Sequence, residues 1–219
     1  MTFAVKICGL STPETLDAAL QAGADTIGFV FHPRSPRNVG LEQAASLVAR
    51  TAGHARTVAL IVDMPPDQAR ALCVSVRPDL LQLHGRETPQ DVAHMRAATG
   101  LKIIKAVGVA GPEDMAAIAA YRDVADHILI DAKPPKGAAY PGGHGQPFDW
   151  AILAALDPGL GFMLSGGLTP ETVAGAIAQV RSLGVRLSGV DVSSGVESAP
   201  GVKDVARIRA FVAAARSAG

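Results

Sequence analysis

Short apolar runs alternate with longer amphipathic segments along the whole chain. Eight runs rich in aliphatic and β-branched residues have the length and composition of buried strands: 3–8, 25–30, 57–62, 79–84, 102–107, 126–131, 161–165 and 189–193. Each run is followed by a turn and then by an alanine-rich segment with amphipathic character. Strands that alternate with helices in this way predict βαβ units and a parallel sheet.

One pattern typical of a helix start recurs along the chain. The sequence TPET at 12–15 returns unchanged at 169–172, with variants at 88–91 and 111–114. Threonine is a good N-cap, proline suits the first helical position, and acidic residues in the first turn interact favourably with the helix dipole. We therefore expect helices to begin at these four places, and we interpret the repeat as architecture rather than as a functional motif.

Eight strands and about eight helices in 219 residues predict an α/β fold, a single (β/α)8 TIM barrel with parallel strands that spans 1–219 as one domain. An open doubly wound sheet is the alternative. No G-x-G-x-x-G motif follows the first strand, so a dinucleotide site is not indicated. The longest irregular segment is 132–148, and its length predicts a functional loop.

Composition and charge exclude several classes of protein. Twenty basic and twenty acidic residues give no net charge, so no electrostatic surface for nucleic acid is expected. The 48% hydrophobic content excludes a disordered chain, and no apolar run reaches the ~18 residues of a spanning helix. No signal-peptide pattern is present, and the two cysteines, Cys8 and Cys73, indicate a reducing compartment. We expect a cytoplasmic protein with no membrane or nucleic-acid partner.

Alternation along the strands predicts which side chains point into the barrel. Polar inward positions at the carboxyl ends of the first, fourth, sixth and eighth strands are Lys6 and Cys8, Gln82 and His84, Asp131, and Asp191. Active sites of such barrels lie at this end. Because buried polar groups need partners, polar side chains from four strands that converge on one mouth favour a functional site over a purely structural core.

Cys8 and Asp131 are candidates for a proton-transfer pair. Lys6, two residues before Cys8 on the same face, is expected to lower the pKa of the thiol and favour the thiolate; the alternative is a small buried apolar side chain. A carboxyl group in a partly desolvated mouth, as expected for Asp131, can act as an acid. The alternative for Asp131 is a structural ion pair with Lys105 or Lys133.

Two late loops have the character of a phosphate site. Gly166 and Gly167 follow the seventh strand, and Ser193, Ser194 and Gly195 follow the eighth. Glycines let backbone N–H groups approach an anion, and a helix start adds partial positive charge. The loops after strands seven and eight are the usual phosphate site of these barrels. Two tight turns without a ligand remain the alternative.

Three further side chains have two interpretations each. Arg34 and Arg37 lie in a basic loop, HPRSPRN at 32–38, and either could bind a carboxylate or be a solvated loop charge. His84 is either an acid–base group or a hydrogen-bonded core residue. Cys73 lies in a predicted helix, where we expect it only to pack.

The chain resembles one enzyme family along essentially its whole length. The resemblance is carried, in order, by KICG at 6–9, GFVF at 28–31, SPR at 35–37, QLHG at 82–85, IDA at 130–132, GGHG at 142–145, FDW at 148–150, SGGL at 165–168 and DVSSGVE at 191–197. Each motif is modest alone, but their order and spacing are specific. They resemble phosphoribosylanthranilate isomerase of tryptophan biosynthesis.

That resemblance implies a (β/α)8 barrel that rearranges N-(5-phosphoribosyl)anthranilate without cofactor or metal. By motif position, Cys8 is expected to be the general base, Asp131 the general acid, and Arg37 the group that binds the anthranilate carboxylate. The backbone of Gly166, Gly167 and 193–195 would bind the phosphate, with His84 and Asp191 lining the pocket. The sequence departs from the common pattern at His144, often Thr, and at Ser165, often Ala.

Two other functions stay open at this point. One is a related phosphosugar aldose–ketose isomerase of histidine biosynthesis, or a bifunctional isomerase; the lack of a clearly duplicated half-barrel with paired aspartates counts against it. The other is a binding protein for a phosphorylated ligand on the same scaffold. The sequence leaves the choice between monomer and homodimer open.

Overall fold

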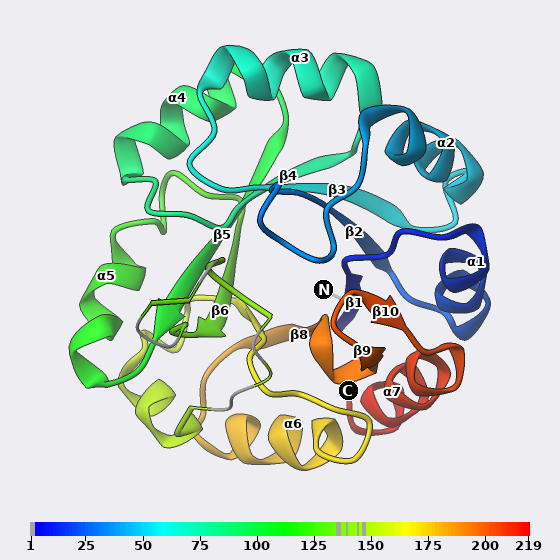
Figure 1. Cartoon of the computed structure of the whole chain (residues 1–219). Helices are drawn as coiled ribbons and strands as arrows, with labels where there is room; N and C mark the ends of the chain where they lie inside the picture. Colours follow the sequence, from blue (N-terminus) through cyan, green and yellow to red (C-terminus); the bar gives the residue numbers. More distant parts are fainter. Residues whose placement is uncertain (1–2, 135–136, 139, 144, 146–147) are drawn as a thin grey trace.

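The structure is a computed structural model that describes residues 3–134, 137–138, 140–143, 145 and 148–219. Eight parallel strands close into a barrel in the order β1 to β8, and β8 pairs with β1. Figure 1 looks into this barrel and shows the helices as an outer ring. The predicted (β/α)8 fold is confirmed.

The predicted strands lie within two residues of the observed ones at both ends. The barrel strands are β1 (Ala4–Cys8), β2 (Thr26–Phe31), β3 (Arg56–Ile61), β4 (Leu80–Leu83), β5 (Lys102–Val109), β6 (His127–Ala132), β7 (Phe162–Leu164) and β8 (Leu187–Val192). The α-helices are α1 (Pro13–Ala22), α2 (Leu41–Thr51), α3 (Pro66–Val76), α4 (Pro89–Thr99), α5 (Met115–Ala119), α6 (Val173–Ser182) and α7 (Val205–Ala218). Three 3-10 helices, η1 (Pro112–Asp114), η2 (Trp150–Ala155) and η3 (Ser194–Val196), and a small hairpin of β9 (Glu197–Ala199) and β10 (Val202–Lys203) complete the described elements.

Two of the four predicted helix starts are N-caps as expected. The Thr12 side chain caps α1 by accepting the backbone N–H of Thr15. Thr88 caps α4 in the same way, and Asp91 returns a hydrogen bond to the Thr88 backbone, which completes a capping box. At both helices the proline occupies the first turn, where its missing N–H costs no hydrogen bond.

The other two places differ from the prediction. The segment at 111–114 forms η1, and α5 follows it directly. At 169–172 the chain makes a turn, and α6 begins only at Val173, with Thr172 as its N-cap. The Thr172 hydroxyl accepts the N–H of Thr169 at 2.9 Å, so this bond closes a turn before the helix instead of capping it at Thr169.

Alternation along the strands separates two layers of core. Side chains such as Val5, Ile130 and Val190 point outward and pack in the large cluster between strands and helices. Inward side chains form a separate cluster inside the barrel, and this cluster includes Leu80 and Leu129. The predicted inward and outward faces of β1, β4, β6 and β8 are confirmed. Polar inward side chains are therefore placed at the carboxyl ends of the strands.

The same kind of side-chain hydrogen bond recurs at the opposite, amino-terminal end of the barrel. An aspartate just before an even-numbered strand accepts a backbone N–H from the strand before it. The three pairs are Asp25 with Val5 at 2.7 Å, Asp79 with Thr57 at 2.7 Å, and Asp126 with Ile103 at 2.8 Å. The fourth strand pair is joined by the Ser188 hydroxyl, which donates to the Phe162 carbonyl at 2.8 Å. These bonds fasten neighbouring strands far from the polar mouth.

We expect Asp79→Ala to destabilise the barrel without affecting the mouth. The substitution removes hydrogen bonds to the Thr57 N–H and hydroxyl, at 2.7 and 2.8 Å. The loss should lower the free energy of unfolding by about 1–3 kcal/mol and Tm by about 2–4 °C for each kcal/mol. Thermal unfolding measures this. The matched control is Asp67→Ala on the surface of α3, where the side chain is 91% exposed and little change is expected. Equal Tm values for the two variants would contradict the expectation.

Candidate active site

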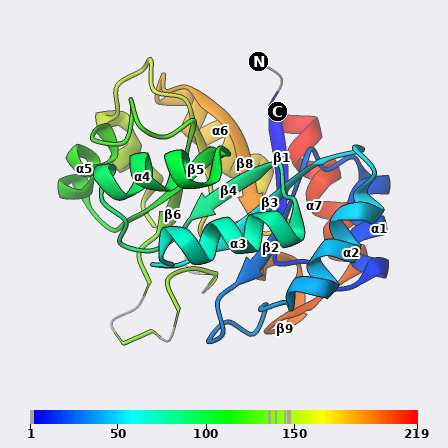
Figure 2. The same cartoon turned by 90° about the horizontal axis from the view of Figure 1, so that it is seen from above.

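A cavity of about 770 Å³, counting space open to solvent, lies at the carboxyl ends of the strands. Figure 2 shows the loops after β2 and β6 and the strand β9 at one and the same end of the barrel. The cavity brings together every site residue that the sequence predicts: Cys8, Arg37, His84, Asp131, Gly166, Gly167, Asp191, Ser193, Ser194 and Gly195. These residues come from six separate parts of the chain, and barrel closure makes them neighbours.

Cys8 lies at the end of β1 with only 3% of its surface exposed. Lys6, fully buried below it, forms an ion pair with Asp191 at 2.7 Å, and the Ser165 hydroxyl donates to the same carboxylate at 3.3 Å. Burial raises the pKa of the Cys8 thiol, and the opposing effect of Lys6 is smaller. The predicted lowering of this pKa is therefore wrong, because burial dominates and Asp191 counters the charge of Lys6.

Asp131 lies at the end of β6 and is held by two groups. Its Oδ1 accepts the N–H of Ala132 at 2.9 Å, and its Oδ2 lies 3.3 Å from Nε2 of His84. On the far side of the ring, the Gln82 amide nitrogen lies 3.0 Å from Nδ1 of His84. An amide nitrogen only donates, so this contact fits the tautomer in which Nε2 carries the proton and faces Asp131. His84 is thus hydrogen-bonded and also part of the cavity wall.

Neither lysine proposed as a structural partner of Asp131 pairs with it. Lys105 points to the outer face of the barrel and forms a buried ion pair with Glu87 at 2.6 Å. Lys133 pairs with Asp114. The alternative of a structural lysine–aspartate pair at Asp131 is therefore wrong, and the carboxyl group faces the cavity beside His84.

The two arginines of the loop after β2 differ sharply. Arg34 is exposed, whereas Arg37 is 5% exposed and lines the cavity. Nε and Nη2 of Arg37 donate to the two carboxylate oxygens of Glu197 at 2.7 and 2.9 Å, and Nη2 also donates to the Gly143 carbonyl at 3.1 Å. The paired donors of Arg37 are thus engaged within the chain. Its Nη1 makes no hydrogen bond to the described residues.

The predicted phosphate loops form the wall between β7 and β8. Gly166 and Gly167 both have positive φ, 84° and 71°, a conformation that favours glycine. After β8, the chain makes the short helix η3. Within the described residues, the N–H groups of Gly166, Gly167 and Ser194 donate to no backbone carbonyl. With no backbone acceptor among those residues, these N–H groups are suited to bind an anion at this wall.

The described part of the long loop after β6 lies close against three side chains of the site, His84, Asp131 and Arg37. A side chain at Gly142 would place its Cβ 2.6 Å from Nε2 of His84 and 2.9 Å from Oδ2 of Asp131. A Cβ at Gly143 would lie 2.7 Å from Nη1 of Arg37. Only glycine allows this approach, so the loop backbone forms one wall of the cavity. His144, where the sequence departs from the common pattern, lies outside the described residues.

The sequence reasoning assigned no role to Glu197 or Lys203. Glu197 appeared only as the last letter of a motif, yet its carboxylate binds both Arg37 and Lys203. Lys203, 1% exposed at its side chain, also donates to the carbonyl and hydroxyl of Ser193. These residues lie in the hairpin beyond β8, where strand alternation gives no guide to facing.

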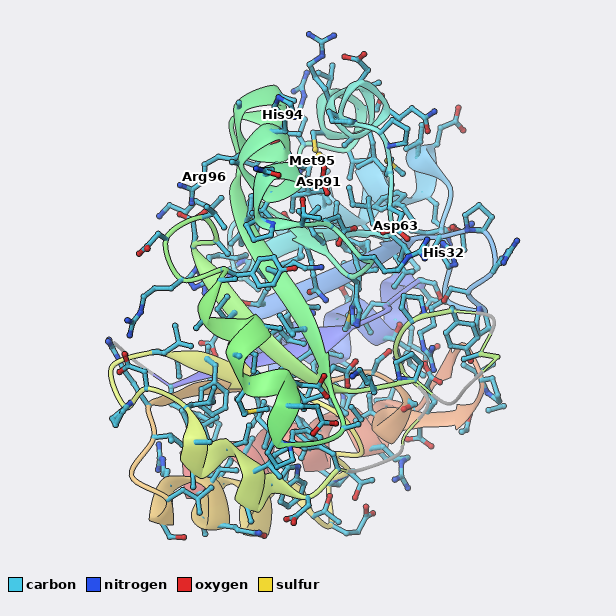
Figure 3. The ribbon with its side chains drawn as sticks, turned by 90° about the vertical axis from the view of Figure 1, so that its left-hand side faces the viewer. His32, Asp63, Asp91, His94, Met95 and Arg96 are labelled. Atoms are coloured by element: carbon cyan, nitrogen blue, oxygen red, sulfur yellow. The ribbon has the colours of Figure 1, made fainter. Side chains whose placement is uncertain are left out.

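Other titratable groups at this end differ in whether they line the cavity. Figure 3 labels His32 and Asp63, which follow β2 and β3, at some distance from the side chains of α4 such as His94. His32 lines the cavity, whereas Asp63 accepts the backbone N–H of Arg86 at 2.6 Å. The described residues contain no group of three His, Cys, Asp or Glu placed to hold a metal ion. Among the same residues, no helix is long and apolar enough to cross a bilayer.

Comparison with known proteins decides the family. The sequence model of the family "N-(5'phosphoribosyl)anthranilate (PRA) isomerase" matches residues 5–214. The chain belongs to this family. An N-(5'-phosphoribosyl)anthranilate isomerase of Afipia carboxidovorans is 54% identical over 218 residues, which cover 100% of the chain and 91% of that protein.

Solved structures of phosphoribosylanthranilate isomerases share the whole fold. The enzyme from Thermotoga maritima has a TM-score of 0.85 at 34% identity, covering 99% of this chain and 100% of that one. A second structure of the family, in complex with reduced 1-(o-carboxyphenylamino)-1-deoxyribulose 5-phosphate, has a TM-score of 0.82 at 32% identity and the same coverage. The ligand of that relative carries a phosphate and a carboxylate.

Proposed function

We propose that the protein isomerises N-(5-phosphoribosyl)anthranilate to 1-(2-carboxyphenylamino)-1-deoxyribulose 5-phosphate, a step of tryptophan biosynthesis. Membership of the phosphoribosylanthranilate isomerase family over nearly the full chain supports this activity. The observation that carries the proposal is the single cavity in which all ten predicted site residues meet. Its separate polar walls suit a ligand with a phosphate at one end and a carboxylate at the other.

The reaction needs an acid first. Opening of the furanose ring requires a proton on the ring oxygen as the C1′–O bond breaks and a protonated imine forms. We assign this step to Asp131, whose carboxyl group lies at the cavity wall. His84, whose Nε2 lies 3.3 Å from Oδ2 of Asp131, can stabilise the carboxylate that remains after the proton has left.

The second step needs a base. The protonated imine makes the C2′ hydrogen acidic, and we assign its removal to the Cys8 thiolate. The electron pair of the broken C–H bond forms the C1′–C2′ double bond of an enolamine and neutralises the imine nitrogen. The enolamine then loses the proton of its C2′ hydroxyl and gains one at C1′, which gives the ketone. At this point Asp131 has given up one proton and Cys8 has gained one, so the transfer of one proton from Cys8 to Asp131, directly or through water, returns both groups to their starting forms.

The two ends of the substrate are bound away from the reacting atoms. We assign the phosphate to the N–H groups of Gly166, Gly167 and the turn 193–195, and the anthranilate carboxylate to Arg37. With both ends fixed, the sugar carbons lie between the acid and the base, which supplies the positioning contribution to the rate. Asp191, already bound by Lys6, lines the floor between them.

We expect Arg37→Ala to act mainly on binding. Removing one charged hydrogen bond to the substrate should raise KM by about 10- to 100-fold with a much smaller change in kcat. Steady-state kinetics with the fluorescent substrate measure both constants. Arg34→Ala is the matched control, because Arg34 lies on the same loop but is exposed. An unchanged KM in Arg37→Ala would remove this residue from the anthranilate site.

The activity itself is tested by two measurements. The purified protein should consume phosphoribosylanthranilate, seen as loss of fluorescence, and the gene should restore growth of a tryptophan auxotroph that lacks this step. Affinity for the substrate without turnover would favour a binding protein instead. Turnover of an aminoaldose of the histidine pathway would favour the related or bifunctional isomerase. A cytoplasmic location and a monomeric or homodimeric state remain predictions.

A further inference from the structure

Four hydrogen bonds converge on one buried carboxylate beside the cavity. Glu197, at the start of β9, accepts Nε and Nη2 of Arg37 at 2.7 and 2.9 Å. It also accepts Nζ of Lys203 at 2.7 Å and the backbone N–H of Gly201 at 3.2 Å. The side chains of Glu197, Arg37 and Lys203 are only 4%, 5% and 1% exposed. Such a fully bonded ionic cluster fixes the position of each member.

We propose that Glu197 is a positioning residue for the anthranilate carboxylate, acting through Arg37; this inference rests on the proposed function. A free arginine side chain samples many rotamers, whereas a planar bidentate pair with a carboxylate fixes the guanidinium. Glu197 occupies Nε and Nη2 and leaves Nη1, which lies against Gly143 in the cavity wall. The substrate carboxylate then meets an arginine whose orientation is set before binding.

Lys203 explains why this arginine still attracts an anion. A simple Arg–Glu pair would be neutral, and a neutral pair binds a carboxylate weakly. Burial lowers the pKa of Lys203 to about 8, despite the opposing effect of Glu197, so Lys203 still carries its charge at pH 7. Two cations on one carboxylate leave one net positive charge next to the cavity.

The same cluster connects the two ends of the site. Nζ of Lys203 donates to the Ser193 carbonyl at 2.8 Å and lies 3.1 Å from the Ser193 hydroxyl. That hydroxyl donates to the backbone carbonyl of Cys8 at 3.1 Å. Ser193 belongs to the turn assigned to the phosphate. Contacts of Glu197 and Lys203 therefore connect Arg37, which is assigned to the anthranilate carboxylate, with the turn assigned to the phosphate and with the end of β1.

The test compares two ligands that differ only in the group Arg37 would bind. One is reduced 1-(o-carboxyphenylamino)-1-deoxyribulose 5-phosphate, and the other is its phenylamino analogue without the carboxylate. The ratio of their Kd values measures the advantage that the carboxylate gives. Glu197→Gln adds net positive charge to the cluster, which alone would raise this ratio. Because the substitution also removes the carboxylate that orients Arg37, we expect the ratio instead to fall by about tenfold or more, nearly to its value in Arg37→Ala, with KM affected more than kcat. A raised ratio would overturn the positioning role. Adding Glu197→Gln to Arg37→Ala should cause little further loss.

Two comparisons separate positioning from a general structural role. Glu197→Asp restores a carboxylate and should recover part of the ratio, whereas Asp79→Ala should lower Tm and leave the ratio unchanged. If Glu197→Gln weakens both ligands equally, Glu197 only stabilises the hairpin and the inference is wrong. Absence of turnover in the unmodified protein would instead reject the proposed function.

A second variant keeps the test valid if Glu197→Gln does not fold. Arg37→Lys retains the positive charge but not the paired donors that Glu197 holds. We expect its carboxylate advantage to fall nearly as far as in Arg37→Ala. A full advantage in Arg37→Lys would show that charge alone suffices, and would overturn the positioning role.

Discussion

Replacing Asp131 with Asn is expected to lower kcat by at least about 10²-fold while the fold is kept. Asparagine has the same shape and its oxygen can still accept the N–H of Ala132, which now binds Oδ1 of Asp131 at 2.9 Å. Its amide N–H groups are far too weakly acidic to protonate the ring oxygen, so ring opening loses its acid. Steady-state fluorescence kinetics and thermal unfolding on the same sample measure the two properties.

A matched control is Asp67→Asn, the same chemical change on the exposed surface of α3, which should leave kcat and KM unaltered. A kcat near that of the unmodified protein in Asp131→Asn would reject Asp131 as the acid. A raised KM with an unchanged kcat would show that Asp131 contributes to substrate binding and not to the chemical step.

Replacing Cys8 with Ser is the second change for which we expect a loss of at least about 10²-fold in kcat. Serine fills nearly the same volume, and Lys6 with Asp191 remains beneath it. A hydroxyl is a far weaker acid than a thiol, so no anion forms to remove the C2′ proton. Cys73→Ser in α3 is the control for loss of a sulfur atom, and it should leave kcat unchanged because Cys73 lies away from the cavity.

The pH profile provides a second readout of the same substitution. The productive form carries one proton on the acid–base pair, with Asp131 protonated and Cys8 as thiolate. Activity therefore falls at alkaline pH once the pair has lost its last proton. Because burial raises the pKa of Cys8, we expect this fall only above the ordinary pKa of a thiol. Cys8→Ser should lack this alkaline limb, and an unchanged profile would exclude Cys8 as the titrating group.

The raised pKa also explains what Lys6 contributes. Most Cys8 is thiol at neutral pH, so the thiolate is a minor form that must be stabilised when it occurs. Moving one proton from Cys8 to Asp131 leaves the total charge of the cavity unchanged and shifts negative charge toward buried Lys6. The lysine thus favours the productive form without making it the ground state.

Features that repeat along the chain could be predicted from the sequence. Strand periodicity gave the barrel, and alternation placed Cys8, His84, Asp131 and Asp191 on its inner face, because side chains in strands have a fixed period of two. The sign of the Cys8 pKa shift could not be found in this way. It depends on how far burial outweighs Lys6, and the sequence does not show that Asp191 already engages that lysine.

The role of Glu197 could not be predicted from the sequence for a related reason. Its partner Arg37 is 160 positions away, and the hairpin that carries Glu197 has no periodic pattern. The prediction that Arg37 binds the carboxylate of a ligand stays a prediction, and in the structure its paired donors bind the carboxylate of Glu197. A sequence motif can include such a glutamate, but only the contacts in the folded structure show which side chain its carboxylate binds.

The three hydrogen bonds that aspartates accept at the amino-terminal end link the strands in pairs. Asp25, Asp79 and Asp126 each join two strands that are consecutive in the chain, and Ser188 does the same for the last pair. None of these four bonds crosses from one strand pair to the next. In a circularly permuted chain with new ends between β2 and β3, or between β4 and β5, both partners of each of these hydrogen bonds would stay on the same continuous segment. These four side-chain hydrogen bonds therefore group the eight strands into four two-strand units at the amino-terminal end.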